Sequence, residues 1–266
     1  MYTFDSRIRY SETDENAVLT VGSLINYFQD CSTFQTQDCG AGLDWLNAQH
    51  LAWVLSYWQI EIFRLPRLYE QVRVGTVPYA LKGFMGLRNY YMDAVSEKGQ
   101  TPHPPQAVPL LLKEKAEAFP IERLAVANSV WALMDMEKML PARITPEHAA
   151  RYTLEEKLPM EYLDRKVKVP EGGEIREAEP VVITHAHLDT NRHVNNGQYV
   201  RMAMNAMGKA GKALRIRAEY KKQAHPGDTI VPVVHAWDDG MIVDLRLEGE
   251  SCCVVEVRTL EDVWGG

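Results

Sequence analysis

The strongest constraint on this chain is an internal repeat between its two halves. Asp189 and Gly197 lie 175 positions after Asp14 and Gly22, respectively. In each half these positions precede a segment with apolar residues at helical spacing, and several strand-like segments follow. We therefore predict an α+β fold with two tandem repeats, each a long helix packed against a bent antiparallel sheet.

Segment patterns give the expected elements and domain boundaries. Helices are expected from Val21 to about Cys39 and from Gly197 to Met207. Strands are expected at 7–10, 51–63, 71–79, 83–94, 124–135, 181–183, 214–224, 229–238, 241–248 and 252–260. Five prolines mark 100–123 as an insertion, since proline cannot donate within a sheet. We expect an N-terminal domain at 1–140, a proline-punctuated linker at 141–179 and a C-terminal domain at 180–266.

Charge and cysteine usage narrow the class of protein. The chain of 266 residues has a formal net charge of -7, which argues against general nucleic-acid binding. No apolar run approaches the roughly 18 residues of a membrane span, so we expect none. The four cysteines (Cys31, Cys39, Cys252 and Cys253) form no CxxC pair. Free thiols and a cytoplasmic location are the simplest interpretation.

The stretch from Asp189 to Tyr199 is the candidate site. It combines a carboxylate, carboxamides, an imidazole and a phenol between a strand signal and a helix signal. A turn that merely caps the helix is the structural alternative. However, His193 corresponds to Val18 in the first repeat. Capping would be needed in both repeats and does not require histidine. The pattern therefore favours a catalytic role for the loop of the second repeat.

Three stretches carry a resemblance to a known family: 53–66, 127–135 and the motif Asp189-x-Asn191-x-His193-Val194-Asn195-Asn196-x-x-Tyr199. They resemble the acyl-ACP thioesterases, a plant-type family with bacterial members and a tandem hotdog fold. The resemblance implies hydrolysis of fatty acyl thioesters of acyl carrier protein, in fatty acid biosynthesis. It also implies acyl carrier protein as the partner, no cofactor and no metal. Known members use the Asn and His of this motif, here Asn191 and His193, with an acid on the following strand.

This chain departs from the family pattern on that strand. The plant-type sequence is Glu-Tyr-Arg-Arg-Glu-Cys, whereas this chain has Glu219-Tyr220-Lys221-Lys222-Gln223-Ala224. Gln223 therefore stands where the family has its second acid, and Ala224 excludes a cysteine nucleophile at the next position. The missing carboxylate is then Asp189 or Glu219, or is not needed.

The residue types suggest roles for thioester hydrolysis. We expect His193 to be the general base, because an imidazole has an unperturbed pKa of about 6.5. Asn191 would hold the water or the substrate carbonyl, and Asp189 would orient His193 or accept from a backbone amide. Gln223 can position water but cannot take a proton. The helix start at Asn195, Asn196 and Gly197 would offer backbone N–H groups to the oxyanion.

Binding surfaces and alternatives complete the expectations. A basic patch would steer the acidic carrier, and an apolar tunnel would hold the acyl chain. The patch comprises Lys209, Lys212, Arg215 and Lys221, and the tunnel Phe28, Phe34, Trp45, Trp53, Leu55 and Tyr57. Alternatives are an acyl-CoA thioesterase of the same fold or a non-catalytic acyl-binding protein. A zinc site formed by His185, His187 and His193 is a less favoured alternative. The oligomeric state stays open between monomer and homodimer.

Overall fold

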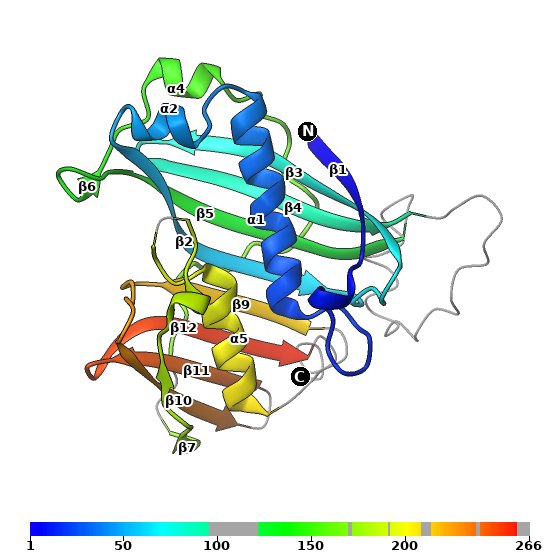
Figure 1. Cartoon of the computed structure of the whole chain (residues 1–266), viewed down its shortest axis with the longest axis vertical. Helices are drawn as coiled ribbons and strands as arrows, with labels where there is room; N and C mark the ends of the chain where they lie inside the picture. Colours follow the sequence, from blue (N-terminus) through cyan, green and yellow to red (C-terminus); the bar gives the residue numbers. More distant parts are fainter. Residues whose placement is uncertain (96–121, 170–171, 191, 209–213, 238–239, 260–266) are drawn as a thin grey trace.

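The computed structural model describes residues 1–95, 122–169, 172–190, 192–208, 214–237 and 240–259 (Figure 1). The described strands form one antiparallel sheet in the order β1-β3-β4-β5-β2-β9-β12-β11-β10-β7, with β6 beside β5 and β8 beside β10. Strands β2 (Leu51–Ile62) and β9 (Leu214–Tyr220) pair along the centre. This pairing joins the two repeats edge to edge into a continuous sheet.

The remaining strands mostly follow the predicted segments, except that no strand was predicted at 140–141 or 174–177. They are β1 (Tyr2–Arg7), β3 (Gln71–Lys82), β4 (Met85–Ala94), β5 (Arg123–Asp135), β6 (Leu140–Pro141), β7 (Glu174–Glu177), β8 (Val181–Val182), β10 (Thr229–Trp237), β11 (Gly240–Leu247) and β12 (Glu250–Thr259). The expected strand at 7–10 is wrong. The first strand ends at Arg7, and Tyr10–Glu12 form a 3-10 turn, η1, in which Glu12 Oε2 accepts from the backbone N–H of Arg9.

Two long helices, α1 (Val21–Asp38) and α5 (Asn196–Met207), lie on the same face of the sheet and contact each other (Figure 1). Thr20 begins α1, with its hydroxyl accepting from the N–H of Ser23. Gly208 ends α5 in the left-handed conformation, at φ 72°, which glycine adopts without penalty. The short helices are α2 (Leu43–Asn47), α4 (Pro146–Ala150) and the 3-10 turn η2 (His185–His187). The predicted α+β architecture of two helix-on-sheet repeats is confirmed.

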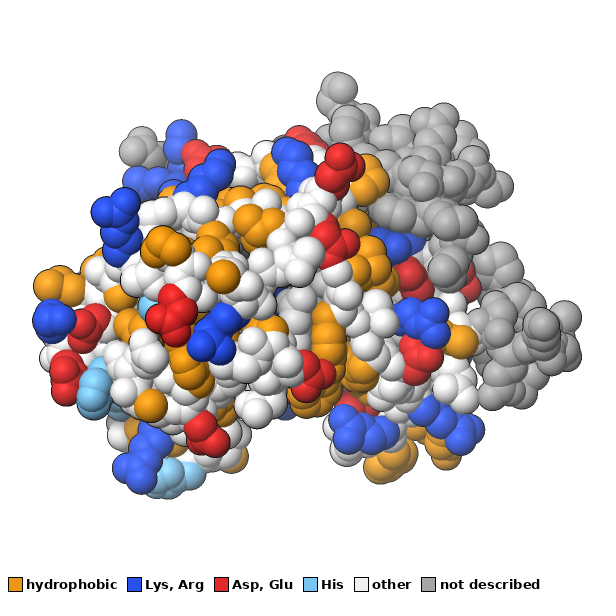
Figure 2. Space-filling view, turned by 90° about the horizontal axis from the view of Figure 1, so that it is seen from above, with side chains coloured by type: hydrophobic (Ala, Val, Ile, Leu, Met, Phe, Trp, Pro, Cys, Tyr) orange, Lys and Arg blue, Asp and Glu red, His pale blue; other side chains and the backbone are white. Residues whose placement is uncertain are grey.

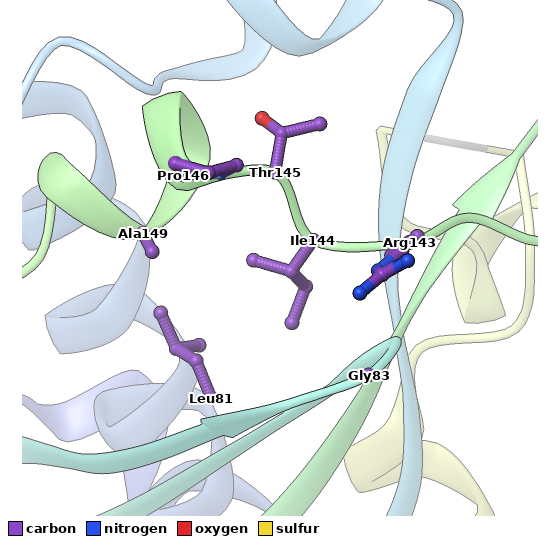
Figure 3. Close-up of a pocket in the computed structure, with 7 residues that line it drawn as sticks. All are labelled: Leu81, Gly83, Arg143, Ile144, Thr145, Pro146 and Ala149. Atoms are coloured by element: carbon purple, nitrogen blue, oxygen red, sulfur yellow. The ribbon is translucent and has the colours of Figure 1, made fainter.

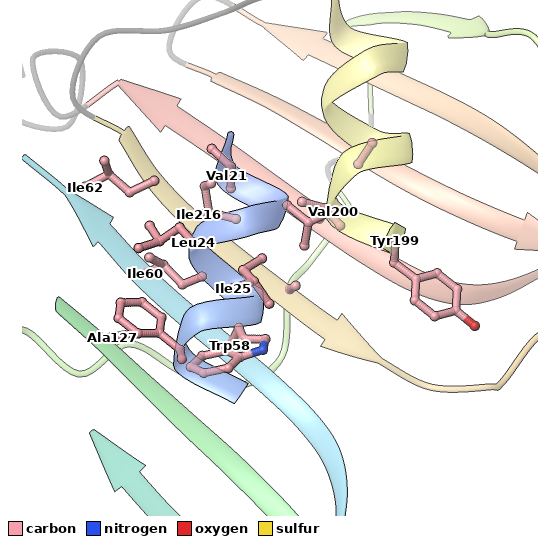
Figure 4. Packing of buried hydrophobic residues seen from close by; sticks show 14 of the residues in the cluster. Val21, Leu24, Ile25, Trp58, Ile60, Ile62, Ala127, Tyr199, Val200 and Ile216 are labelled. Carbon is pink, nitrogen blue, oxygen red and sulfur yellow. The ribbon is translucent and has the colours of Figure 1, made fainter. Parts of the chain in front are cut away.

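The core lies between these helices and the sheet. Figure 4 shows Leu24 and Ile25 of α1 packing over Trp58 and Ile60 of β2, all of which are fully buried. Burying each such aliphatic side chain contributes about 1.5–3 kcal/mol. Val200 of α5 belongs to the same cluster, so one core spans both repeats. None of the described helices is long and apolar enough to cross a bilayer.

The opposite, outer face of the sheet is covered by part of the predicted linker at 141–179. Backbone N–H groups of Leu158 and Leu163 donate to Asn89 Oδ1 and Gln59 Oε1, both at 3.0 Å. Gln59 and Asn89 are buried, and these bonds satisfy them. The segment also supplies β7, which pairs with β10. The predicted insertion at 100–123 lies outside the described residues except for Glu122 and Arg123.

Candidate active site

The loop that carries His193 is built on a backbone frame that occurs in both repeats. In the first repeat, Asp14 Oδ1 accepts from Val18 N at 3.0 Å, and Asp14 N donates to Val18 O at 2.8 Å. In the second, Asp189 Oδ1 accepts from His193 N at 3.2 Å, and Asp189 N donates to His193 O at 2.8 Å. The aspartates are thus equivalent structural residues, and His193 occupies the position of Val18.

Backbone conformation confirms the equivalence. Ala17 and Arg192 have φ values of 58° and 61°, in the left-handed region that costs a residue with a side chain about 1–2 kcal/mol. Each loop is preceded by a 3-10 turn, and a short antiparallel bridge closes it. The frame is therefore architecture, whereas the imidazole is present in one copy only.

This frame gives Asp189 one of the two roles expected for it. Its Oδ1 accepts from the backbone amide of His193, the second of the two alternatives. Asp189 therefore fixes the chain that carries the imidazole. In η2, His187 has a structural contact as well, because its Nδ1 accepts from Thr184 N at 3.0 Å. Asn191 lies outside the described residues, and its catalytic role stays a prediction.

His193 is half-buried and lines a groove of about 1390 Å³ between the two repeats. Its ring stands edge-on to that of His225, with 6.1 Å between centroids. Gln223 and Lys221 line the same groove from the segment after β9, and Asn26, Gln29 and Asp30 line it from α1. The groove therefore brings the motif of the second repeat against the long helix of the first.

The start of α5 differs from expectation in one respect. Gly197 N does not offer a free N–H, because it donates to Asn195 Oδ1 at 2.8 Å. The N–H of Gln198 donates to the backbone oxygen of Asn195 at the same distance. The carboxamide of Asn195 is therefore a helix cap. An oxyanion at Gly197 would have to displace it, so that part of the expectation is corrected.

Tyr199, which is buried, and Tyr220, which is partly buried, connect this helix start to Gln223. Tyr220 Oη donates to Asn196 O at 3.0 Å, and Ala224 N donates to Tyr199 Oη at 2.9 Å. Their rings pack edge-on at 5.8 Å. Burial raises the pKa of both phenols, which keeps them protonated. In Figure 4 the Tyr199 hydroxyl points away from the apolar cluster. These bonds hold the segment containing Gln223 beside the motif.

Two expected site residues lie on the wrong face of the sheet. Successive strand residues alternate, and Tyr220 faces the helices, so Glu219 faces outward, where its Oε2 accepts from Val167 N at 3.0 Å. Arg215 also faces outward and is 5% exposed. It pairs with Glu61 and Glu161 at 2.9 Å each. Glu219 as a catalytic acid and Arg215 as a carrier contact are both wrong.

The rest of the expected basic patch is less complete than the sequence suggested. Lys221 is at the groove, whereas Lys209 and Lys212 lie outside the described residues. On the face shown in Figure 2, described Lys and Arg side chains are interspersed with acidic and apolar ones. Arg201, on α5, also lines the groove. Arg201 and Lys221 therefore contribute positive charge to a groove that Arg9, Arg88 and Lys222 also line, together with the acidic side chains of Glu12, Asp30 and Asp189.

Apolar walls extend the groove into the first repeat. Of the predicted tunnel residues, Phe34, Trp53 and Leu55 line it. The other three do not line the groove. Phe28 is in the core, Trp45 packs on the ring of His148, and Tyr57 lies on the outer face beside Val167. Including Tyr57 in the tunnel was wrong. A β-bulge between Leu55 and Tyr57 changes which face the following residues occupy.

A smaller pocket of about 490 Å³ lies near α4, between the β3–β4 turn and the segment before that helix (Figure 3). Its lining is Leu81, Gly83, Arg143, Ile144, Thr145, Pro146 and Ala149, which offers no general base. The described residues contain no cluster of three His, Cys, Asp or Glu side chains placed to hold a metal. The large groove is thus the candidate active site.

Sequence reasoning missed the contribution of α1, because that helix was read only for its apolar face. Gly22, Asn26 and Gln29 recur at a spacing of four and three, which places them on one helix face. Gln29 Oε1 accepts from Asn196 Nδ2 at 2.7 Å. The polar residues along this face of α1 are the sequence feature that could have indicated its place beside the site.

Comparisons with known proteins agree with this architecture. Two family models match, the acyl-ACP thioesterase N-terminal domain over residues 1–117 and the acyl-ACP thioesterase C-terminal domain over 174–256. An acyl-ACP thioesterase from Bacteroides thetaiotaomicron is similar in structure, with a TM-score of 0.76, 22% identity and 96% of each chain covered. The 12:0-ACP thioesterase from Umbellularia californica has a TM-score of 0.72 and 14% identity, covering 97% of this chain and 96% of its own. No curated protein matches the sequence.

At these identities the solved structures establish the fold, a tandem hotdog, over nearly the full length. The family models establish more, because together they cover most of the chain and match its two repeats separately. The chain belongs to the acyl-ACP thioesterase family.

Proposed function

We propose that His193 is the general base with which this chain hydrolyses fatty acyl thioesters of acyl carrier protein. The reaction is that of the family, the conversion of acyl-[acyl carrier protein] to free fatty acid and carrier. One observation carries the assignment of the base. The frame of the motif loop is duplicated, but the imidazole occurs only in the copy that lines the groove.

The chemistry requires one water and no further reactant. His193 takes a proton from the water as its oxygen bonds to the thioester carbonyl carbon. The tetrahedral intermediate then collapses, the carbon–sulfur bond breaks, and its electron pair goes to sulfur. His193 returns the proton to the departing thiolate. The products are a fatty acid and the free thiol of the carrier.

The neighbouring residues divide the remaining tasks. Asp189 positions the backbone of His193 and is a positioning residue, while Asn191 is proposed to hold the water or the carbonyl. Asn195 and Asn196 present carboxamides at the start of α5, where the helix dipole favours a developing oxyanion. Gln223 is proposed to orient water. Its amide cannot accept the proton, which leaves that task to the imidazole.

Substrate binding is proposed to use both repeats. Trp53, Leu55 and Trp131 supply apolar surface for the acyl chain. Arg201 and Lys221 supply local positive charge for an acidic carrier, which the chain's overall charge of -7 would otherwise repel. Because α1 and α5 come from the two repeats, one chain brings both sides of the groove together, and a homodimer is not needed to form this site.

Organisation and location remain our proposals too. We propose domains at 1–140 and 180–266, with 141–179 as a connecting segment that packs on the sheet. We propose a cytoplasmic location, which is supported by four free cysteines.

Side-by-side kinetics on acyl carrier protein and CoA thioesters of the same acyl chain test the substrate. We expect the carrier thioester to have the higher kcat/KM. Lys221→Glu should raise KM for the carrier thioester and leave KM for the CoA thioester unchanged. A higher kcat/KM for CoA thioesters would instead support the acyl-CoA alternative, and binding without thiol release would support an acyl-binding protein.

A further inference from the structure

The two long helices approach each other closely at their first turns. A Cβ added to Gly197 of α5 would lie 3.1 Å from Gly22 O of α1 and 3.2 Å from Asn26 Oδ1. A side chain at position 197 would crowd this backbone-to-backbone contact, so the close approach favours glycine there. It also places the α1 face that carries Gln29 directly beside the start of α5.

Gln29 contacts both carboxamides that follow the catalytic histidine. Its Oε1 accepts from Asn196 Nδ2 at 2.7 Å, and its Nε2 donates to Asn195 Oδ1 at 3.5 Å. The same Asn195 oxygen caps Gly197 N at 2.8 Å. A single side chain of the first repeat therefore restrains two neighbouring residues of the motif, and Gln29, Asn195 and Asn196 all line the groove.

The pseudo-symmetry of the chain shows that this contact is not part of the shared frame. The position equivalent to Gln29 in α5 is Met204, which packs against the core. The positions equivalent to Asn195 and Asn196 are Thr20 and the buried Val21. No carboxamide stands at any of these three positions. These two contacts of Gln29, which we call the clamp, therefore have no counterpart at the equivalent positions, just as the imidazole of His193 has none.

A clamp needed only for helix packing would serve equally at both helix starts. Gln29 instead fixes the residues two and three positions after His193, where a displacement of about 1 Å can cost on the order of 10²-fold in rate. We propose that Gln29 is a positioning residue for thioester hydrolysis, acting through the carboxamides of Asn195 and Asn196. This inference rests on the proposed role of the motif loop. If Gln29 has this role, a residue of the first repeat helps to position the catalytic loop of the second repeat.

Steady-state kinetics on an acyl carrier protein thioester test the proposal. Gln29→Met keeps the length of the side chain and removes both hydrogen bonds, so kcat should fall by about 10-fold or more while KM changes by less than about 2-fold. Gln29→Glu keeps the acceptor for Asn196 and should retain more kcat than Gln29→Met. Gln49→Met, at an exposed position after α2, is the matched control and should have wild-type kinetics.

A double-mutant cycle separates positioning from general stability. Asn196→Ala should lower kcat as Gln29→Met does, and the double variant should be no slower than the slower single variant, because both changes break the same contact. Wild-type kcat in Gln29→Met, or losses that multiply in the double variant, would overturn the inference. A wild-type protein without thiol release would instead refute the proposed function itself.

Discussion

Gly22 and Gly197 provide a matched pair of substitutions at the contact between the two repeats. Both are the second residue of their helix, so alanine should improve helix propensity equally, by up to about 1 kcal/mol. Their surroundings differ. A Cβ at Gly22 would meet nothing closer than 3.6 Å, an ordinary contact, whereas a Cβ at Gly197 would lie 3.1 Å from Gly22 O and 3.2 Å from Asn195 Oδ1.

The difference in contact distance sets the expected effects. Gly197→Ala must shift one helix or the Asn195 cap, and overpacking of this kind costs about 1–3 kcal/mol. Each kcal/mol should lower Tm by roughly 2–4 °C in a chain of this size. Because Gly197 lies four residues after His193, kcat should fall as well. Gly22→Ala should leave Tm and kcat unchanged or raise Tm slightly.

Differential scanning calorimetry and a thiol-release assay on both variants provide the test. The expected order is that Gly197→Ala has the lower Tm and the lower kcat. If Gly22→Ala destabilised the protein as much as Gly197→Ala, the close approach of the helix starts would not be the cause. Equal stability of Gly197→Ala and wild type would refute the geometry directly.

Two further substitutions test buried groups away from the site. His235 is 5% exposed and neither ring nitrogen has a hydrogen-bond partner among the described residues, so burial, opposed by Asp244, lowers its pKa. The unfolded chain then binds more protons, and stability should fall as pH drops below the ordinary value of about 6.5. Urea unfolding should show His235→Leu losing less stability than wild type at acidic pH. Arg215→Ala breaks a buried ion pair with Glu61 and should lower the free energy of unfolding by about 3–5 kcal/mol. If it instead raised only the KM for the carrier thioester and left stability unchanged, Arg215 would be a carrier contact after all.

Much of the fold and part of the site can be predicted from the sequence. The repeat can be recognised because the residues that hold the backbone of each loop and helix start occur in both halves. Asp14 and Asp189 each hold their loop through the same main-chain bonds, and Gly22 and Gly197 meet at the helix contact. Residues with such local duties recur in both repeats. His193 then stands out as the residue that differs within a frame that both repeats share.

The errors arose where neighbouring segments, rather than local pattern, decide the outcome. The strand expected at 214–224 includes both Glu219 and Gln223, but β9 ends at Tyr220, and Lys221 N and Lys222 N both donate to Cys252 O. The strand alternation is lost before Gln223. Arg215 is part of the predicted basic patch, but Glu161 of the predicted linker pairs with it on the outer face of the sheet. Neither arrangement has a local sequence signal.

The partner of the motif was missed for a related reason. Gln29 is an ordinary polar residue of an amphipathic helix, and only the crossing of the two helices makes it a contact of Asn195 and Asn196. A repeat seen in sequence predicts that two helices exist, but not which of their polar faces meet.

The kcat of His193→Ala on an acyl carrier protein thioester tests most directly whether the imidazole of His193 carries the reaction. We expect kcat to fall by about 10²–10⁴-fold, or roughly 3–5 kcal/mol of barrier. His185→Ala, an exposed histidine in the preceding turn, should retain wild-type kcat. A His193→Ala enzyme with near-wild-type kcat would contradict the assignment.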